Sequence, residues 1–124
     1  MRLLLDTHVL IWWSSGSPIS PAATQGITAP NNEVFVSLAS VWEAEIKAAS
    51  GRLRLDADLE AEPAEHGFRS LEISAAHAMA AARLPRHHGD PFDRMLIVQA
   101  QLEGLTLVTR DPVFARYEVP LLAA

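Results

Sequence analysis

Four acidic residues of this chain stand where a carboxylate could do chemistry. Asp6 directly follows the apolar run "RLLL", and Asp111 comes two residues after the run "LTLVT". Asp93 lies in "HHGDPFDRM", and Glu43 lies in "SVWEAEIK". Carboxylates that converge repel one another unless a divalent cation neutralises them, and such oxygen ligands suit Mg²⁺ or Mn²⁺. A cation held in this way can activate a water and offset the charge of a phosphodiester, so the pattern predicts metal-dependent phosphodiester hydrolysis.

Each of these acids also has an ordinary structural interpretation. Asp6 could cap a helix that opens at "THVLIWW", and Asp111 could be a turn residue before a proline. Glu43 lies four residues before Lys47, the favourable orientation for an exposed helical ion pair worth about 0.3–0.5 kcal/mol. Glu45 lies on the same expected helix, so spacing alone leaves open which of the two glutamates, if either, faces a site.

The two aspartates of "HHGDPFDRM" have different expected roles. If a helix begins at Pro91, which has no N–H to satisfy at the first helical position, then Asp90 is its N-cap. Asp93 is then the third helical residue, where an acid can bond back to the cap and favour the helix dipole. The residues three, four and seven positions beyond Asp93 are apolar, however, so its side chain projects from the face expected to pack against the sheet. A carboxylate there is costly unless a cation or a hydrogen-bond donor meets it.

The elements that must position these acids alternate between short apolar runs and longer helical segments. Strands are expected at residues 2–5, 33–37, 70–74 and 105–109, with a short edge strand at 118–122. Helices are expected at residues 7–13, from 21 onward, and at 37–50, 57–68 (interrupted by Pro63), 75–84 and 91–103. This alternation predicts one α/β domain over residues 1–124, a three-layer α/β/α arrangement around a mainly parallel central sheet. Ligands collect at the carboxyl ends of such strands, where Asp6 and Asp111 are expected.

Composition narrows the class of protein further. The 124 residues include 10 Lys and Arg against 15 Asp and Glu, and the formal charge of −5 argues against binding nucleic acid by bulk electrostatics alone. Cysteine is absent, which excludes thiolate chemistry, thiolate metal sites and disulfides. No apolar run approaches the roughly 18–20 residues of a membrane-spanning helix. We therefore expect a soluble, cytoplasmic protein.

Several stretches of the chain occur together in the order of a known family. They are "LLLDTHVLIWW", "SLASVWEAEIKAASGRL", "LPRHHGDPFDRMLIVQAQLEGLTLVTRDPVF" and "YEVPLL". Together, over nearly the whole chain, they resemble a PIN-domain toxin of the VapC type. The resemblance implies a Mg²⁺- or Mn²⁺-dependent endoribonuclease that is the toxin of a toxin–antitoxin pair and hydrolyses tRNA or rRNA. It also implies a homodimer, a cognate antitoxin that covers the site, and assembly into a larger toxin–antitoxin complex.

The resemblance carries the acids over position by position. It places the family's catalytic and metal-binding acids on Asp6, Glu43, Asp93 and Asp111, with Asp6 and Asp93 as the principal metal ligands. The choice of Glu43 comes from the resemblance and not from helical spacing. Asp90 belongs to the variant pattern "HxDPFDR" and is a further candidate metal ligand.

The resemblance also assigns supporting residues. The hydroxyls of Thr7 and Thr109 lie beside acids, where the family often places a hydroxyl that supports the metal ligands. Arg94 and Arg110 each adjoin an acid and are candidate contacts to RNA phosphate, with ordinary surface or ion-pair roles as the alternative. The two histidines of "HHGD" are expected in a solvated loop or at an RNA contact.

Two other functions remain as alternatives. One is a phosphatase or dehalogenase-like hydrolase with Asp6 as the nucleophile, but such sites need a second aspartate two residues on, where this chain has His8. The other is a non-catalytic PIN module that only binds RNA or a protein. A pure binder with a charge of −5 has little use for converging carboxylates, which favours the nuclease.

Overall fold

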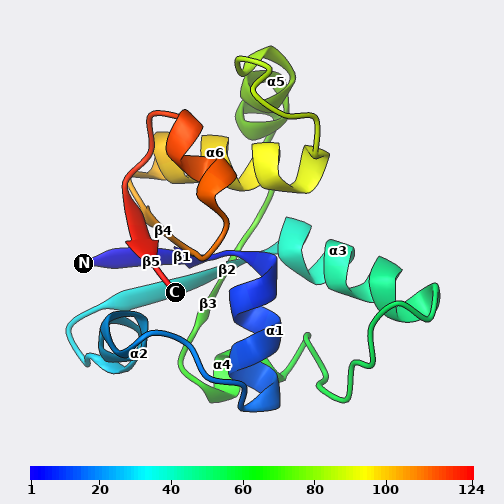
Figure 1. Ribbon diagram of the computed structural model, residues 1–124, viewed down its shortest axis with the longest axis vertical. Helices are drawn as coiled ribbons and strands as arrows, with labels where there is room; N and C mark the ends of the chain where they lie inside the picture. Colours follow the sequence, from blue (N-terminus) through cyan, green and yellow to red (C-terminus); the bar gives the residue numbers. More distant parts are fainter.

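A five-stranded parallel sheet forms the middle layer of the protein. The computed structural model describes residues 1–124, and the strands run in the order β3-β2-β1-β4-β5 with every neighbouring pair parallel. The strands are β1 (Arg2–Leu5), β2 (Glu33–Ser37), β3 (Arg69–Leu71), β4 (Thr106–Thr109) and β5 (Leu121–Ala123). Helices lie on both faces of the sheet (Figure 1), so the predicted α/β/α architecture is confirmed.

The helices divide between the two faces and the carboxyl edge of the sheet (Figure 1). One face carries α1 (Thr7–Ser15), α2 (Pro21–Thr28) and the one-turn α4 (Glu62–Glu65). The other face carries α6 (Pro91–Glu103), on which α5 (Ala75–Arg83) packs. Beyond the carboxyl ends of the strands, α3 (Leu38–Ala49) contacts both α1 and α6, and a 3₁₀ helix, η1 (Pro112–Arg116), follows β4. None of these helices has the length and apolar composition that a membrane span requires.

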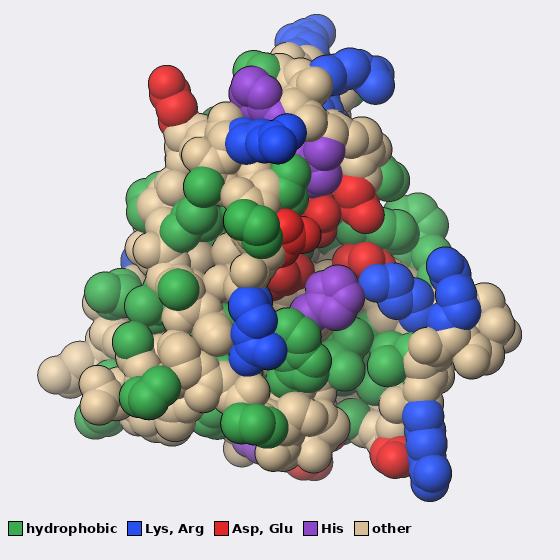
Figure 2. Space-filling model, in the orientation of Figure 1, with side chains coloured by type: hydrophobic (Ala, Val, Ile, Leu, Met, Phe, Trp, Pro, Cys, Tyr) green, Lys and Arg blue, Asp and Glu red, His purple; other side chains and the backbone are tan.

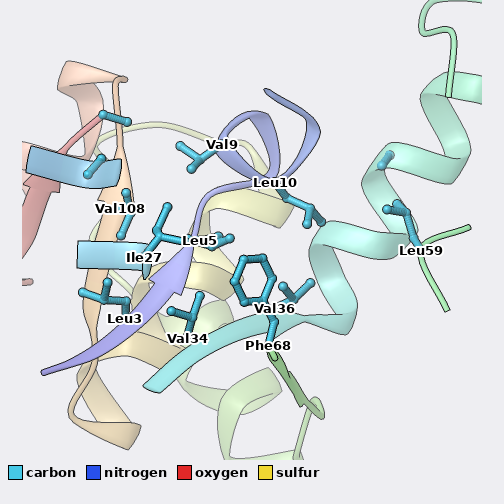
Figure 3. Close-up of a cluster of buried hydrophobic side chains, with 13 residues drawn as sticks. Leu3, Leu5, Val9, Leu10, Ile27, Val34, Val36, Leu59, Phe68 and Val108 are labelled. Atoms are coloured by element: carbon cyan, nitrogen blue, oxygen red, sulfur yellow. The ribbon is translucent and has the colours of Figure 1, made fainter. Parts of the chain in front are cut away.

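The central strand β1 is apolar throughout its buried part because both of its faces are covered. Leu3 and Leu5 belong to one core cluster and Leu4 belongs to the other, as the alternation of side chains along a strand requires. Figure 3 shows the first cluster, in which these two leucines meet side chains of α1, α2 and β2. The second cluster joins Leu4 to the apolar side of α6.

Capping side chains define where several helices begin. Ser20 accepts a 3.0 Å hydrogen bond from the Ala23 N–H at the start of α2. Ser74 accepts one of 3.1 Å from the His77 N–H at the start of α5. The predicted helical segments from residue 21, at 75–84 and at 91–103 are thereby confirmed to within a residue at their starts.

Three predicted segments differ from the structure. In place of a helix over 57–68, only the single turn of α4 forms, and Pro63 lies in its first turn, where its missing N–H is tolerated. β3 ends at Leu71 because Leu71 pairs with Ser37, the last residue of β2, which is the only strand beside β3. At the other edge, the Leu107 N–H donates to the Pro120 carbonyl, so β5 starts after the proline instead of at residue 118.

The order of the strands produces a switch point at the centre of the sheet. β1 pairs with β2 on one side and with β4 on the other, and the chain visits these two neighbours at very different points in its course. Loops that follow such strands leave in opposite directions and open a crevice at the carboxyl edge, where ligands of open α/β sheets bind.

Candidate active site

Asp6 occupies the N-cap position of α1 without capping it. Its residue surface is only 3% exposed, and its Oδ2 accepts a 2.8 Å hydrogen bond from the Thr109 hydroxyl. Thr109 ends β4, which neighbours β1, so the bond joins the ends of two adjacent strands. The structure thus places Asp6 at the N-cap, as the ordinary interpretation requires, but turns its carboxylate into the crevice.

Glu43 and Glu45 lie on different sides of α3. Glu45 is exposed, whereas Glu43 is 6% exposed and faces the other acids. One carboxylate oxygen of Glu43, Oε2, pairs with Lys47 Nζ at 3.0 Å, so the ion pair expected from their spacing is present. The other oxygen, Oε1, is buried and has no hydrogen-bond partner. Glu43 therefore does both things: it pairs with Lys47 along the helix, and it faces the site.

Asp90 and Asp93 have the different roles that their positions in the chain predict. Asp90 is exposed and caps α6, since its Oδ1 accepts hydrogen bonds from the N–H groups of Phe92 at 2.9 Å and Asp93 at 3.0 Å. The Asp93 side chain is 17% exposed and lies beside His88, whose Nε2 is 3.3 Å from Asp93 Oδ2. Asp93 is thus half-enclosed at the edge of the crevice, one helical turn away from the exposed cap.

Asp111 and Thr7 lie near the site with partners of their own. Asp111 is exposed, and its Oδ1 accepts a 2.9 Å hydrogen bond from the Val113 N–H at the start of η1. Its own N–H donates to the Thr109 hydroxyl at 3.1 Å. The Thr7 hydroxyl does not support an acid, contrary to expectation, because it donates to Ser40 Oγ of α3 at 3.1 Å. Thr109 is therefore the threonine whose hydroxyl contacts a candidate ligand.

The electrostatics of the site show that these acids share one crevice. Burial, and after it the negative charges of four other acids, raise the pKa of Asp93 to about 8. In decreasing order of effect those acids are Asp90, Asp6, Glu43 and Asp111. Burial also raises the pKa of Asp6, while the hydrogen bond from Thr109 and the charge of His8 lower it. Without a counter-charge, the site therefore holds protons that ordinary carboxyl groups release.

The donor set of the crevice suits a hard divalent cation. All five acids offer carboxylate oxygen, the ligand that Mg²⁺ and Mn²⁺ prefer. The buried, unpartnered Oε1 of Glu43 is costly as it stands, and a cation would supply the partner that it lacks. No three acidic or histidine side chains are grouped closely enough to form a ready-made metal cage, so binding would be accompanied by side-chain adjustment.

Figure 2 shows acidic side chains gathered in a depression in the middle of one face, between the parts of the surface formed by α6 and α1. Histidine and basic side chains lie at its margins. A negatively charged floor with positive groups around it is compatible with a polyanion that approaches a cation-loaded site.

Arg94 is not available to contact RNA, which corrects the expectation from its position beside Asp93. It is 6% exposed, and its guanidinium donates hydrogen bonds to four backbone carbonyls around the end of α5 and the following loop. The acceptors, at 2.6–3.3 Å, are the carbonyls of Ala81, Leu84, Pro85 and His88. Arg94 therefore has a structural role, the anchoring of that loop on α6.

Arg110 remains at the surface beside the site. Its guanidinium lies 4.1 Å from the ring centroid of Trp12 and donates hydrogen bonds to the carbonyls of Ala124 and Pro18. A pocket of about 410 Å³ adjoins it, and Thr109 and Asp111 also line this pocket. Of the two arginines expected to meet RNA, Arg110 is the one that the structure leaves exposed.

His88 and Tyr117 are the residues of the site that the sequence did not reveal. The loop containing His88 was expected to be solvated or to contact RNA, but the side chain of His88 is 18% exposed and lies between Asp93 and the buried Tyr117. His88 precedes Asp93 by only five residues, so the "HxDPFDR" pattern was the available signal. Tyr117, which is much later in the chain, left no such signal.

The chain is similar to known proteins in both sequence and fold. The sequence model of the PIN domain family matches residues 3–120. Ribonuclease VapC22 of Mycobacterium tuberculosis (strain ATCC 25618 / H37Rv) is 35% identical over 114 residues, which cover 88% of this chain and 86% of that protein.

Two solved structures illustrate the similarity of fold. The DNA-bound VapBC crystal structure from Salmonella typhimurium has a TM-score of 0.72 at 17% identity, covering 99% of this chain and 98% of that one. A toxin–antitoxin complex from Klebsiella pneumoniae has a TM-score of 0.68 at 24% identity, covering 97% and 95%. At these identities the structural likeness bears on the fold alone.

Proposed function

The chain belongs to the PIN-domain family, and on this premise we propose that it is a VapC-type endoribonuclease that hydrolyses RNA phosphodiester bonds with Mg²⁺ or Mn²⁺. It acts as the toxin of a toxin–antitoxin pair. The observation that carries the proposal is the convergence of acids from separate parts of the chain on one crevice, including a buried carboxylate oxygen of Glu43 that has no partner.

Asp6 and Asp93 would be the principal ligands of the cation, with Glu43 and Asp111 completing the site directly or through water. A bound Mg²⁺ or Mn²⁺ supplies an activated water and offsets the charge of the phosphodiester. Asp90 is best explained as the cap of α6, because its Oδ1 already accepts two backbone N–H groups.

The protein's own residues have separate tasks in this proposal. The Thr109 hydroxyl holds Oδ2 of Asp6 and favours its ionised form. Lys47 compensates part of the charge of Glu43 through Oε2 and leaves Oε1 free for the site. Arg110, exposed beside the pocket that Asp111 helps to line, would contact the phosphate backbone of an RNA strand.

Membership of the PIN-domain family also suggests which molecules this protein binds. The relative VapC22 is named a ribonuclease, and the structural neighbours from Salmonella typhimurium and Klebsiella pneumoniae are a VapBC assembly and a toxin–antitoxin complex. We infer a cognate antitoxin for this chain, an RNA substrate of the tRNA or rRNA class, and a homodimeric toxin within a larger complex. The cytoplasm, where such RNA is found, is the inferred location.

The proposal is tested by RNA cleavage with the purified, metal-stripped protein. Total tRNA and rRNA should be cut on addition of Mn²⁺ or Mg²⁺, and Asp6→Asn or Asp93→Asn should abolish the cutting while leaving the circular dichroism spectrum unchanged. Glu43→Gln should also impair cleavage strongly. Glu45→Gln is its matched control, because Glu45 lies on the same helix and is exposed, and it should cleave like the unaltered protein.

Two outcomes would count against this function. Cleavage that persists in excess EDTA, or in the Asp6→Asn/Asp93→Asn double variant, would exclude the metal-site mechanism. RNA binding without any cleavage at saturating Mn²⁺ would instead identify a non-catalytic PIN module.

A further inference from the structure

His88 is held from both sides of its imidazole ring. Its Nδ1 lies 2.7 Å from the hydroxyl of Tyr117, and its Nε2 lies 3.3 Å from Oδ2 of Asp93. Tyr117 is 7% exposed, so the group behind His88 belongs to the protein core and not to a mobile surface. The ring therefore bridges the core and a carboxylate of the candidate site.

The loop that carries His88 is fixed by further contacts. The guanidinium of Arg94 donates hydrogen bonds to the carbonyls of His88, at 3.3 Å, and Pro85, at 3.0 Å. The backbone N–H of His88 donates to the Tyr117 oxygen at 3.2 Å. Both the backbone and the side chain of His88 are thus restrained, which a solvated loop residue would not require.

The directions of these hydrogen bonds indicate which ring nitrogen of the neutral imidazole carries the hydrogen. The Tyr117 oxygen already accepts the backbone N–H of His88, so the phenolic hydrogen is free to point at Nδ1 over the short distance of 2.7 Å. Nδ1 is then the acceptor, and Nε2 carries the hydrogen. That hydrogen faces Asp93 Oδ2, because the partner of one ring nitrogen determines the role of the other.

The donor at Nε2 engages only one oxygen of Asp93. The distance of 3.3 Å is slightly longer than the usual 2.7–3.2 Å range, so the bond has room to shorten when the carboxylate becomes fully ionised. No group of the protein donates a hydrogen bond to Oδ1 of Asp93. The imidazole therefore orients the carboxylate with one oxygen held and the other one left for a ligand.

We propose that His88 is a positioning residue for the cation site, which sets the orientation of the Asp93 carboxylate through Nε2–H while the Tyr117 hydroxyl keeps the imidazole in that form. This inference rests on the proposed function, because it assigns Asp93 a cation to bind. Residues that orient metal ligands typically change metal affinity by about 10- to 100-fold when they are removed. His88 does not itself touch the cation or the substrate.

The test is calorimetric titration of the metal-free, full-length protein with Mn²⁺ in the absence of RNA. His88→Ala should weaken Mn²⁺ binding by about tenfold or more. His88→Gln should recover most of the loss, because the glutamine amide can present an N–H near the position of Nε2. Tyr117→Phe should give an intermediate loss, since it keeps the ring and its packing but removes the hydroxyl. His87→Phe is the matched control, because the exposed His87 makes no side-chain hydrogen bond and phenylalanine keeps the edge-on ring contact with Tyr117, so its Mn²⁺ affinity should be unchanged.

A second readout requires no metal. Long-range ¹H–¹⁵N spectra of the metal-free protein at about pH 9, where the Asp93 carboxylate is ionised, should show His88 with its hydrogen on Nε2. Under the same conditions Tyr117→Phe should produce a mixture of the two neutral forms. Equal Mn²⁺ affinities of His88→Ala and the unaltered protein would overturn the proposal, as would equal losses in the alanine and glutamine variants. If the unaltered protein binds no Mn²⁺ at all, the proposed function fails as well, so the two failures can be told apart.

Discussion

The Thr109 hydroxyl donates a 2.8 Å hydrogen bond to Oδ2 of Asp6, and so links the carboxyl ends of β4 and β1 inside the candidate site. This bond lowers the pKa of Asp6 against the effect of burial. Thr109→Val has nearly the same shape but no hydroxyl, so the pKa of Asp6 should rise further. RNA cleavage near neutral pH should fall by about 2- to 10-fold, in line with roughly 0.5–1.5 kcal/mol for one hydrogen bond.

The pH–rate profile of cleavage checks this prediction. The rising limb of the Thr109→Val profile should move to higher pH, and Thr109→Ser should restore both the position and the rate. A valine variant with an unchanged profile would show that the hydroxyl does not govern the charge of Asp6.

Asp93 should make the metal-free protein less stable at alkaline pH. Its pKa in the folded protein is raised from 3.8 to about 8, so the folded state keeps a proton that the unfolded chain releases. The stabilising effect of this protonation is complete below the unfolded value and is lost as the pH rises through the folded value. Asp93→Asn should therefore raise the Tm of the metal-free protein at about pH 9, and much less at about pH 5.

Thermal unfolding in EDTA at both pH values measures this difference. Asp56→Asn is the control, because the Asp56 side chain is 80% exposed, and it should show no comparable pH dependence. Mn²⁺ should raise the Tm of the unaltered protein at high pH but not that of Asp93→Asn. A Tm gain of the same size at both pH values would contradict the assignment of a raised pKa to Asp93.

The capping of α6 by Asp90 can be tested separately from the effect of its negative charge. Asp90→Ser retains a side-chain oxygen that can accept the N–H groups at the start of α6, whereas Asp90→Ala does not. The alanine variant should lose about 0.5–2 kcal/mol in the free energy of unfolding, and the serine variant should lose little. Because the charge of Asp90 raises the pKa of Asp93, Asp90→Ser should also shift the cleavage profile toward lower pH.

Urea unfolding and Mn²⁺ titration of the same two variants provide the measurements. If the serine variant folds normally but no longer binds Mn²⁺, Asp90 is a metal ligand and not only a cap.

Replacing Arg94 should mainly reduce stability, whereas replacing Arg110 should mainly weaken RNA binding. Arg94→Met removes the donor to four backbone carbonyls in a buried place, so the free energy of unfolding should fall by about 2–4 kcal/mol. Arg110→Met removes an exposed guanidinium stacked on Trp12, so stability should change by about 1 kcal/mol or less. RNA affinity in EDTA, followed by fluorescence anisotropy, should drop for Arg110→Met. A fully stable Arg94→Met protein with weakened RNA binding would restore the original RNA-contact interpretation of Arg94.

Local signals in the sequence were sufficient for most of the fold. The apolar run before Asp6 predicts a strand buried on both faces, and Pro91 with Asp90 predicts the start of α6, because these features depend on neighbours only a few residues away. The prediction was less accurate for the end of β3 and the start of β5. Each depends on pairing with a strand that is distant in the sequence, β2 for the end of β3 and β4 for the start of β5.

The sequence by itself determined which acids could form a site, because residue type, strand ends and helix starts are local properties. Only the tertiary structure decided how each side chain is used. It joins the carboxylate of Asp6 to the Thr109 hydroxyl, leaves one oxygen of Glu43 buried without a partner, and withdraws Arg94 from the surface. It also brings Tyr117 against His88 across 29 positions of the chain. Such contacts depend on the packing of elements far apart in the sequence, and no local pattern encodes them.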